Sequence, residues 1–132
     1  MSDDMREFLK ERGCPDDVVA GGLEGLVATW EHTVSQVEAG YPLGLDDYLN
    51  DLDGRQLLED ALDEAPAGTA AALRGRVEAA DARMRRHVNR VDECLWGERV
   101  AAAERWDADR NWWYFAVPRQ PAGMLREDLE GR

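Results

Sequence analysis

Residues 23–39, LEGLVATWEHTVSQVEA, contain the most regular apolar pattern in the chain. Apolar residues recur there every three or four positions, the spacing that places side chains on one face of a helix. They are Leu23, Leu26, Val27, Trp30, Val34 and Val37. Gly40 follows them, and glycine at such a position commonly ends a helix. The pattern predicts an amphipathic helix over 23–39, with Trp30 in the core.

Short helices are expected before this one, within residues 1–22. Apolar side chains along residues 5–9 are spaced for one short amphipathic helix. Pro15 and the two aspartates after it favour a second helix start, because proline fits the first turn and carboxylates stabilise the positive end of the helix dipole. The adjacent glycines Gly21 and Gly22 are expected to break or kink this second helix.

Three further helices are predicted over 45–52, 53–64 and 70–95. The boundary at Asp53 follows from a slip in the phase of the apolar residues, and Asp53 and Gln56 have the spacing of a capping box. Along 70–95 the apolar residues keep a spacing of three or four throughout. This spacing predicts one continuous helix, long enough to be the central element of a bundle.

An aromatic segment follows, WWYFAV at 112–117, and it precedes a C-terminal tail at 118–132. Such a run favours an extended strap over a helix. Alternate side chains of an extended strap point in opposite directions, so one set packs on the helices and the other faces outward. Trp112, Trp113 and Tyr114 are therefore candidate contact residues. The competing interpretation is that both sets are covered within the monomer.

Composition agrees with a helical fold. The chain has 132 residues, 44% of them apolar and 33% charged, which is typical of one globular domain. Isoleucine is absent and threonine is rare, whereas β-strands favour such β-branched residues. We predict an all-α, single-domain antiparallel bundle of three or four main helices, with the extended aromatic segment near its C-terminus.

Charge is distributed unevenly along the chain, whose net charge is −12. Residues 1–64 carry 17 acidic and 4 basic side chains, and residues 65–132 carry 11 acidic and 12 basic ones. We expect the acidic first half to pack beside the arginine-rich helix at 70–95, so that the charges offset one another. The negative net charge repels a phosphate backbone, so we expect no nucleic-acid partner.

The segment LDDYLNDLDGR at 45–55 is the most distinctive stretch, with four aspartates. Clustered carboxylates such as Asp46, Asp47 and Asp51 suggest a cation site, but a calcium loop with its glycine at Gly54 would need an oxygen ligand where Leu49 stands. Carboxylates at a helix start also stabilise the helix dipole and accept from free backbone amides, with no ligand required. We favour this capping role, and expect neither a metal nor a cofactor.

Catalytic motifs are missing from the sequence. The two histidines, His32 and His87, lie in no metal-binding motif, and His87 is expected to pack at the edge of the core. The two cysteines, Cys14 and Cys94, form no redox or zinc motif, and Cys94 is expected to be buried. The protein is therefore more easily understood as a binding protein than as an enzyme.

The favoured function is a cytoplasmic protein–protein interaction or regulatory module that binds another protein or itself. Neither a membrane-spanning stretch nor a secretion signal is apparent in the sequence. The candidate contact residues are Asp46, Asp47, Asp51, Trp112, Trp113 and Tyr114.

Two alternatives stay open. The first is a small-molecule or cation-binding bundle, with or without enzyme activity, whose pocket would be built from Trp96, Trp106 and Trp112 with polar groups from Asp47, Asp51 or Arg110. The second is an acidic inhibitor or immunity-type protein that imitates a polyanion and binds a basic partner.

Overall fold

Three long helices, α2, α3 and α4, form the core of the protein. The computed structural model describes residues 2–132, with side chains from Asp4 onward. The elements in chain order are α1 (Ser2–Glu11), α2 (Asp16–Ala39), α3 (Leu45–Glu64), α4 (Ala67–Arg85), β1 (Val88–Arg90), α5 (Glu98–Glu104), the 3-10 helix η1 (Trp112–Phe115), β2 (Ala116–Pro118) and α6 (Gly123–Glu130). This composition confirms the all-α class, with a two-stranded sheet as a small addition.

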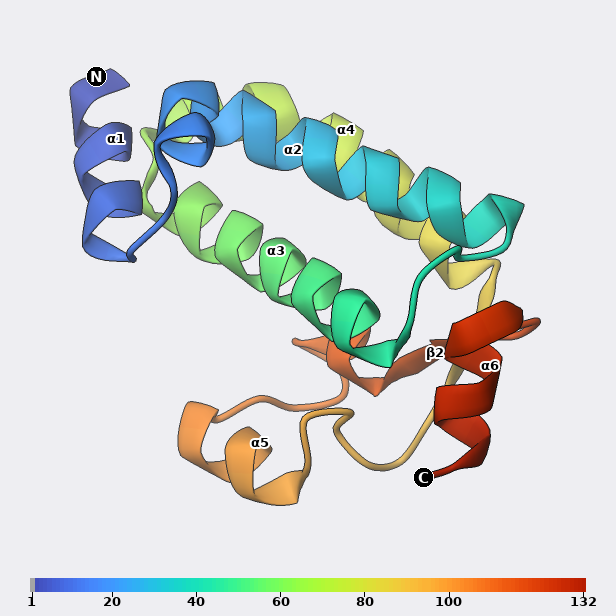
Figure 1. Cartoon of the computed structure of the whole chain (residues 1–132). Coiled ribbons are helices and arrows are strands. Elements are labelled where there is room, and N and C mark those ends of the chain that lie inside the picture. The colour runs from blue at the N-terminus through green and yellow to red at the C-terminus, as the bar shows by residue number, and fades with distance from the viewer. Residues whose placement is uncertain (1) are drawn as a thin grey trace.

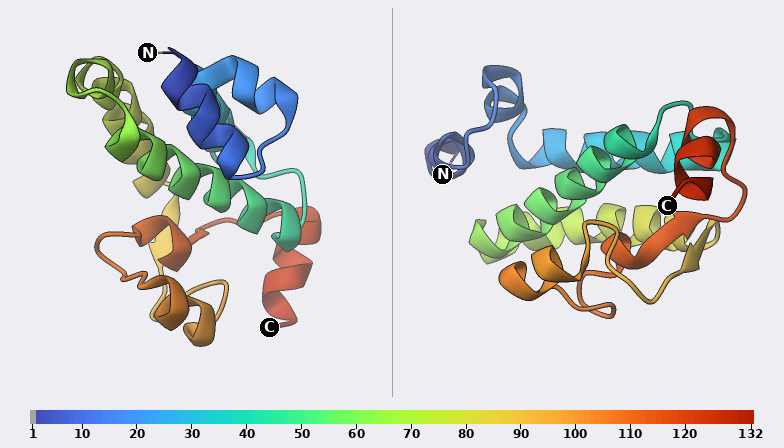
Figure 2. Two further views of the ribbon diagram at one scale, coloured as in Figure 1. Left: turned by 90° about the vertical axis from the view of Figure 1, so that its left-hand side faces the viewer. Right: turned by 60° about the horizontal axis from the view of Figure 1, so that its bottom comes forward.

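The helices are arranged around α2, which packs against α1, α3 and α4 (Figure 1). The chain from α5 onward lies on the side of α3 away from α2, as Figure 1 and the left view of Figure 2 both show. In the described residues no helix is both long enough and apolar enough to cross a bilayer.

The predicted helix at 23–39 is confirmed, and every residue of its apolar pattern is buried. It is the main part of α2, which begins directly after Pro15, as the proline and the aspartates predict. The predicted kink is also present, because Gly22 has φ 63° and ψ −156°, a conformation outside the helical region. The kink lets the first turns of α2 leave the line of the main helix.

The predicted boundary at Asp53 is wrong, because α3 is one helix through residues 45–52 and 53–64. Its buried face continues from Leu52 through Arg55 to Leu58 at three-residue intervals. An arginine therefore occupies the position where the sequence pattern lacks an apolar residue. The apparent slip in phase marks a buried charge and not a new helix.

The predicted continuous helix at 70–95 is also wrong, because α4 ends at Arg85. After a turn, Val88–Arg90 pair with Ala116–Pro118 as an antiparallel strand, with Asn89 opposite Val117. The apolar residues of this stretch stay in the core, packed against the aromatic segment instead of along a helix. Apolar residues spaced three or four positions apart can be buried either along one helix or in a helix followed by a strand and a loop. The spacing therefore did not distinguish the two structures.

The aromatic segment at 112–117 is not one extended strap. Its first four residues form η1 and the rest belong to β2. In the tail at 118–132, α6 packs on α3 and buries Leu125. His87 is exposed, contrary to expectation, whereas Cys94 is buried as expected, in the loop after β1.

The kink at Gly22 gives a test of the fold. Gly22→Ala is expected to lower the free energy of unfolding by about 1–3 kcal/mol, because its positive φ with ψ near −156° is a conformation that side chains disfavour. Gly21→Ala is the matched control. Gly21 is helical and exposed, so alanine there should be neutral or stabilising by up to about 1 kcal/mol. Urea denaturation of both variants measures the difference, and equal effects would contradict the kink.

Candidate functional site

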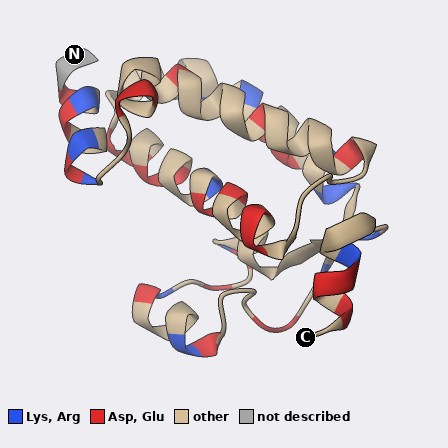
Figure 3. Cartoon of the chain, viewed as in Figure 1, with Lys and Arg blue, Asp and Glu red and all other residues tan. Residues whose placement is uncertain are grey.

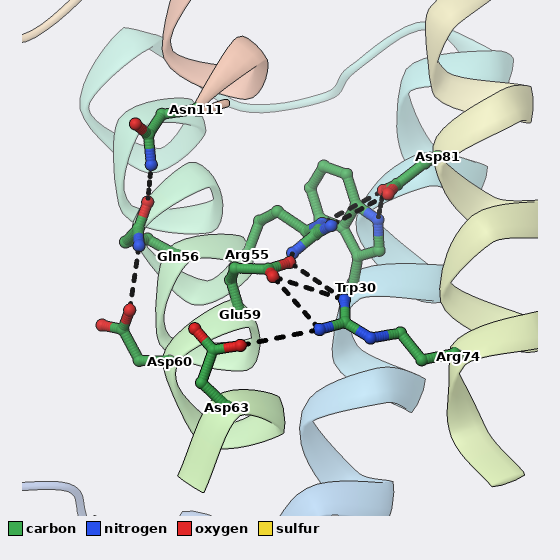
Figure 4. A network of polar contacts seen from close by, with 9 residues as sticks. All are labelled: Trp30, Arg55, Gln56, Glu59, Asp60, Asp63, Arg74, Asp81 and Asn111. Atoms are coloured by element: carbon green, nitrogen blue, oxygen red, sulfur yellow. Dashed lines mark hydrogen bonds and ion pairs between the residues drawn. The ribbon is translucent and has the colours of Figure 1, made fainter. Parts of the chain in front are cut away.

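The guanidinium of Arg55 is buried at the centre of the helix bundle, with the residue 3% exposed. It makes two hydrogen bonds to Asp81 of α4, from Nε to Oδ1 at 3.1 Å and from Nη2 to Oδ2 at 2.9 Å. The Nε1 of Trp30 in α2 also donates to Asp81 Oδ1, at 2.8 Å. These contacts, drawn in Figure 4, join α2, α3 and α4 through one carboxylate.

Two indole rings enclose the Arg55 guanidinium. Its carbon lies 4.2 Å from the ring centroid of Trp113 and 5.9 Å from that of Trp30. The face of the Trp113 ring thus makes a cation–π contact with the guanidinium, and such a contact is favourable away from water. The Nε1 of Trp113 is buried and has no acceptor among the described residues.

The network extends from Arg55 toward solvent through Glu59. Glu59 accepts from Arg55 Nη1 at 3.0 Å and from Arg74 of α4 at 3.3 Å, and Arg74 also lies 3.7 Å from Asp63 (Figure 4). Burial alone raises the pKa of Glu59, but the hydrogen bonds from Arg74 and Arg55 outweigh it and hold the pKa below its usual value. Glu59 therefore stays ionised.

A cleft of about 550 Å³ opens between α3 and the chain of α5 with the segment after it, and Glu59 and Asp63 of the network also line it. A charged rim and an aromatic wall surround it. Its lining residues are Arg12, Asp53, Gln56, Leu57, Glu59, Asp60, Asp63, Glu104, Arg105, Trp106, Arg110, Asn111 and Tyr114. We call this the acidic cleft, because five carboxylates and three guanidinium groups line it.

A chain of hydrogen bonds runs along the acidic cleft. Asn111, which is buried, donates to Gln56 at 2.9 Å, and Gln56 donates to Asp60 Oδ1 at 3.0 Å. Arg12, just after α1, donates to Asp60 Oδ2 at 2.9 Å. Both oxygens of Asp60 thus have fixed donors, which orient the carboxylate and link the two ends of the cleft.

The aromatic wall of the cleft consists of Trp106 stacked on Tyr114, with ring centroids 3.9 Å apart and planes 15° apart. The hydroxyl of Tyr114 donates to Asp53 Oδ1 at 2.6 Å, and Trp96 Nε1 donates to the same oxygen at 3.0 Å. Burial, and after it the hydrogen bond to Asp53, raises the pKa of Tyr114 far above its usual value. This tyrosine therefore acts as a donor in the wall and not as a proton-transfer group.

The turn after α5 positions the far rim of the cleft. Arg105 ends α5 with φ 60° and is the only non-glycine residue with positive φ in the described chain. Asp107 Oδ1 then accepts the backbone N–H groups of Asp109 and Arg110 at 3.0 and 2.7 Å. These contacts, led by the one from Arg110, hold the pKa of Asp107 below its usual value. The turn places two arginines at the rim.

The predicted acidic contact residues lie away from this cleft, at the start of α3. Asp46 is exposed, and Asp47 accepts the backbone N–H of Gly44 at 3.3 Å, which is the capping role proposed for these carboxylates. Asp51 is partly buried and accepts from the hydroxyl of Tyr41 at 2.5 Å. No cluster that suits a metal ion is found among the described residues.

Trp113 and Tyr114, two of the three predicted aromatic contact residues, are each 1% exposed, because η1 turns both rings into the core. Tyr114 still lines the acidic cleft, under the ring of Trp106. Trp112 is partly exposed, and the Arg85 guanidinium lies 4.5 Å from its ring centroid.

The alternative pocket is found only in part. Trp106 and Arg110 do line the acidic cleft, but Trp96, Trp112 and the aspartates at the start of α3 do not. Sequence reasoning missed most of its carboxylates. The available signal was the polar series Asp53, Gln56, Asp60 and Asp63, whose spacing of three or four places it on one face of α3.

Asp51 gives a test of these electrostatics. Burial, with repulsion from Asp47, raises its pKa although Tyr41 hydrogen-bonds to it. A raised pKa means that folding favours the protonated form of Asp51. The free energy of unfolding therefore falls as the pH rises from about 4 through the raised pKa of this carboxyl group. Asp51→Asn is therefore expected to raise the melting temperature at pH 7, with a smaller gain near pH 4.

Asp46→Asn is the control for this prediction, because it removes the same charge from an exposed position. It should give no gain at either pH. A lower melting temperature for Asp51→Asn at neutral pH would contradict the burial argument.

Comparison of the chain with protein-family models, with curated proteins and with solved structures finds no match. The geometry of the acidic cleft is therefore the basis for inferring a function.

Proposed function

We propose that this protein is a non-catalytic binding module that recognises a basic segment of a partner protein in the acidic cleft. The observation that carries the proposal is the composition of the cleft. Five carboxylates, against three guanidinium groups, surround a cavity with an aromatic wall. A lysine or arginine side chain is complementary to such a cavity in both charge and shape.

The aromatic wall favours a cation with an apolar stem. Trp106 is partly exposed, and its ring stacks on the buried ring of Tyr114. An arginine or lysine of the partner is stabilised over such a ring by cation–π attraction, while its methylene groups cover the apolar surface.

The internal contacts of the carboxylates support recognition rather than proton transfer. Asp53, Glu59 and Asp60 each accept from at least two donors of the protein itself. The low pKa of Glu59 suits a permanent charge, whereas a general acid or base works best with a pKa near the operating pH. Glu59 and Asp60 are paired with arginines of the protein itself. Among the described residues, Asp53 accepts only from the neutral Trp96 and Tyr114, and so keeps a fixed, uncompensated charge for a cationic partner.

The net charge of the chain supports the same proposal. At −12 it attracts a basic protein over a distance comparable with the Debye length. Such steering raises the rate of association with a basic partner, and the exposed Asp63 and Glu104 lie at the rim where it would first make contact.

A second candidate function is binding of a small organic cation in the same cleft. The observation that favours it is the volume of about 550 Å³, which lies within the range of small-molecule sites. Spermidine and arginine amide are suitable probes. If either raises the melting temperature more than the basic peptide described next, the small-molecule function is preferred.

The proposal is tested with the fluorescein-labelled peptide Gly-Arg-Lys-Arg-Gly and its glutamate counterpart. Fluorescence anisotropy is expected to show saturable binding of the basic peptide alone. The double variant Asp63→Lys/Glu104→Lys should weaken it by about tenfold or more, since like charges then face each other. Both residues are exposed, so the substitutions should spare the fold.

Glu127→Lys with Asp4→Lys is the matched control, because these exposed acids lie on α6 and α1 outside the cleft. It carries the same change in net charge and should retain most of the affinity. Trp106→Ala should weaken binding as well. If the control and the cleft variant lose affinity equally, the peptide responds to net charge alone and the cleft is not its site.

A further inference from the structure

Two sets of arginines, on α4 and in or near the strands after it, have different surroundings. Those that face α2 and α3 are paired with carboxylates: Arg76 with Glu31 at 2.6 Å, and Arg83 with Glu38. A second set is exposed where α4 ends and the two strands pair, and consists of Arg85, Arg86, Arg90 and Arg119. Figure 3 shows basic residues at this end of the molecule.

The second set is poorly neutralised by the protein itself. Among the described residues, Arg85, Arg86 and Arg119 form no ion pair. Arg90 lies 3.4 Å from Asp109, but both side chains are largely exposed, so water weakens this pair. A chain with 28 acidic residues thus leaves several of its 16 basic residues free on one surface.

A groove of about 360 Å³ lies within this surface. Arg85 and Arg90 line it together with the partly exposed ring of Trp112, and apolar residues complete the lining. These are Val88, Phe115, Ala116 and Ala108, with Asp109 beside them. We call it the basic groove. It shares no lining residue with the acidic cleft.

We propose that the basic groove binds a short acidic peptide segment of a partner protein, with an apolar side chain against Trp112 and carboxylates at Arg85 and Arg90. Arginine suits this role because its planar guanidinium can donate two parallel hydrogen bonds to one carboxylate. The apolar lining favours a peptide that has an apolar residue between its acidic ones.

Charge explains why a short peptide fits better than a nucleic acid. At physiological ionic strength the field of the arginines extends about 8 Å, enough for a bound segment of a few residues. A longer polyanion passes from this patch onto a protein whose net charge is −12 and is repelled. The inference is independent of the acidic cleft, since it names another surface and a partner of opposite charge.

The test uses four fluorescein-labelled peptides, Asp-Glu-x-Asp-Glu-Asp with x as Leu, Val, Phe or Trp, titrated by fluorescence anisotropy. At least one is expected to bind the wild-type protein saturably, and more weakly as salt is raised. Arg85→Glu/Arg90→Glu should weaken it by about tenfold or more. Arg90→Glu alone leaves the contact of Arg85 with Trp112 in place, so it reports on the groove even if the double variant misfolds.

The control is Lys10→Glu with Arg6→Glu, which reverses two exposed charges of α1 and should leave binding unchanged. Three results would overturn the inference. They are no saturable binding by any of the four peptides, equal loss in the control, or binding of an oligothymidylate of matched charge as tightly as the best peptide. Loss of the basic-peptide binding at the acidic cleft would not affect it, because the two experiments use different variants and probes.

Discussion

The guanidinium of Arg55 is the charge around which the long helices are arranged. It is the only charged residue in the described chain that is buried, and α2, α3, α4 and η1 each contribute a group to its surroundings. Removing a guanidinium from water costs several kcal/mol unless its donors and charge are matched. Asp81 and Glu59 provide that match, so the helices must pack where these acids reach Arg55.

This requirement restricts the register of the bundle more tightly than apolar packing does. Apolar faces tolerate small slides of one helix along another, because many neighbouring arrangements bury similar area. The two bonds from Arg55 to Asp81 and the bond from Trp30 tolerate little displacement. We infer that the buried pair contributes to the specificity of this fold, a role known for some buried polar groups.

The same residue connects the core with the surface. Its contact with Glu59 leads through Arg74 to Asp63, so the acidic cleft rests on helices whose relative position Arg55 sets. On its other side Trp113 covers the guanidinium, and η1 carries the neighbouring Trp112 to the basic groove. The acidic cleft and the basic groove are therefore both connected to Arg55 through neighbouring side chains.

Local periodicity predicted the main part of α2, whose buried residues are apolar except for Thr33. The pattern at 23–39 needed no information beyond its spacing, and the kink at Gly22 followed from glycine chemistry. The prediction failed at Arg55, since burial of an arginine depends on Asp81, 26 positions away. It failed again at 70–95, because pairing of Val88–Arg90 with Ala116–Pro118 is a contact between distant segments.

The candidate site was less predictable than the fold for the same reason. The polar face of α3 was visible in the sequence, but its partners come from α1 and from the turn after α5. Asn111 and Arg12 are brought to Gln56 and Asp60 only by tertiary packing. Conversely, Asp47 at the start of α3 carries out local capping, which sequence reasoning did identify.

A double-mutant cycle on Arg55 and Asp81 tests the central role of the buried pair most directly. Urea denaturation of Arg55→Met, Asp81→Leu and the double variant gives the coupling free energy. Each single change is expected to cost about 3–5 kcal/mol, because it leaves one buried charge without its partner. The double variant removes both charges, so it should cost much less than the sum of the two single changes. The partly exposed pair Arg76 and Glu31 should give a far smaller coupling. Additive losses at Arg55 and Asp81, or single losses no larger than at the Arg76–Glu31 pair, would contradict the account.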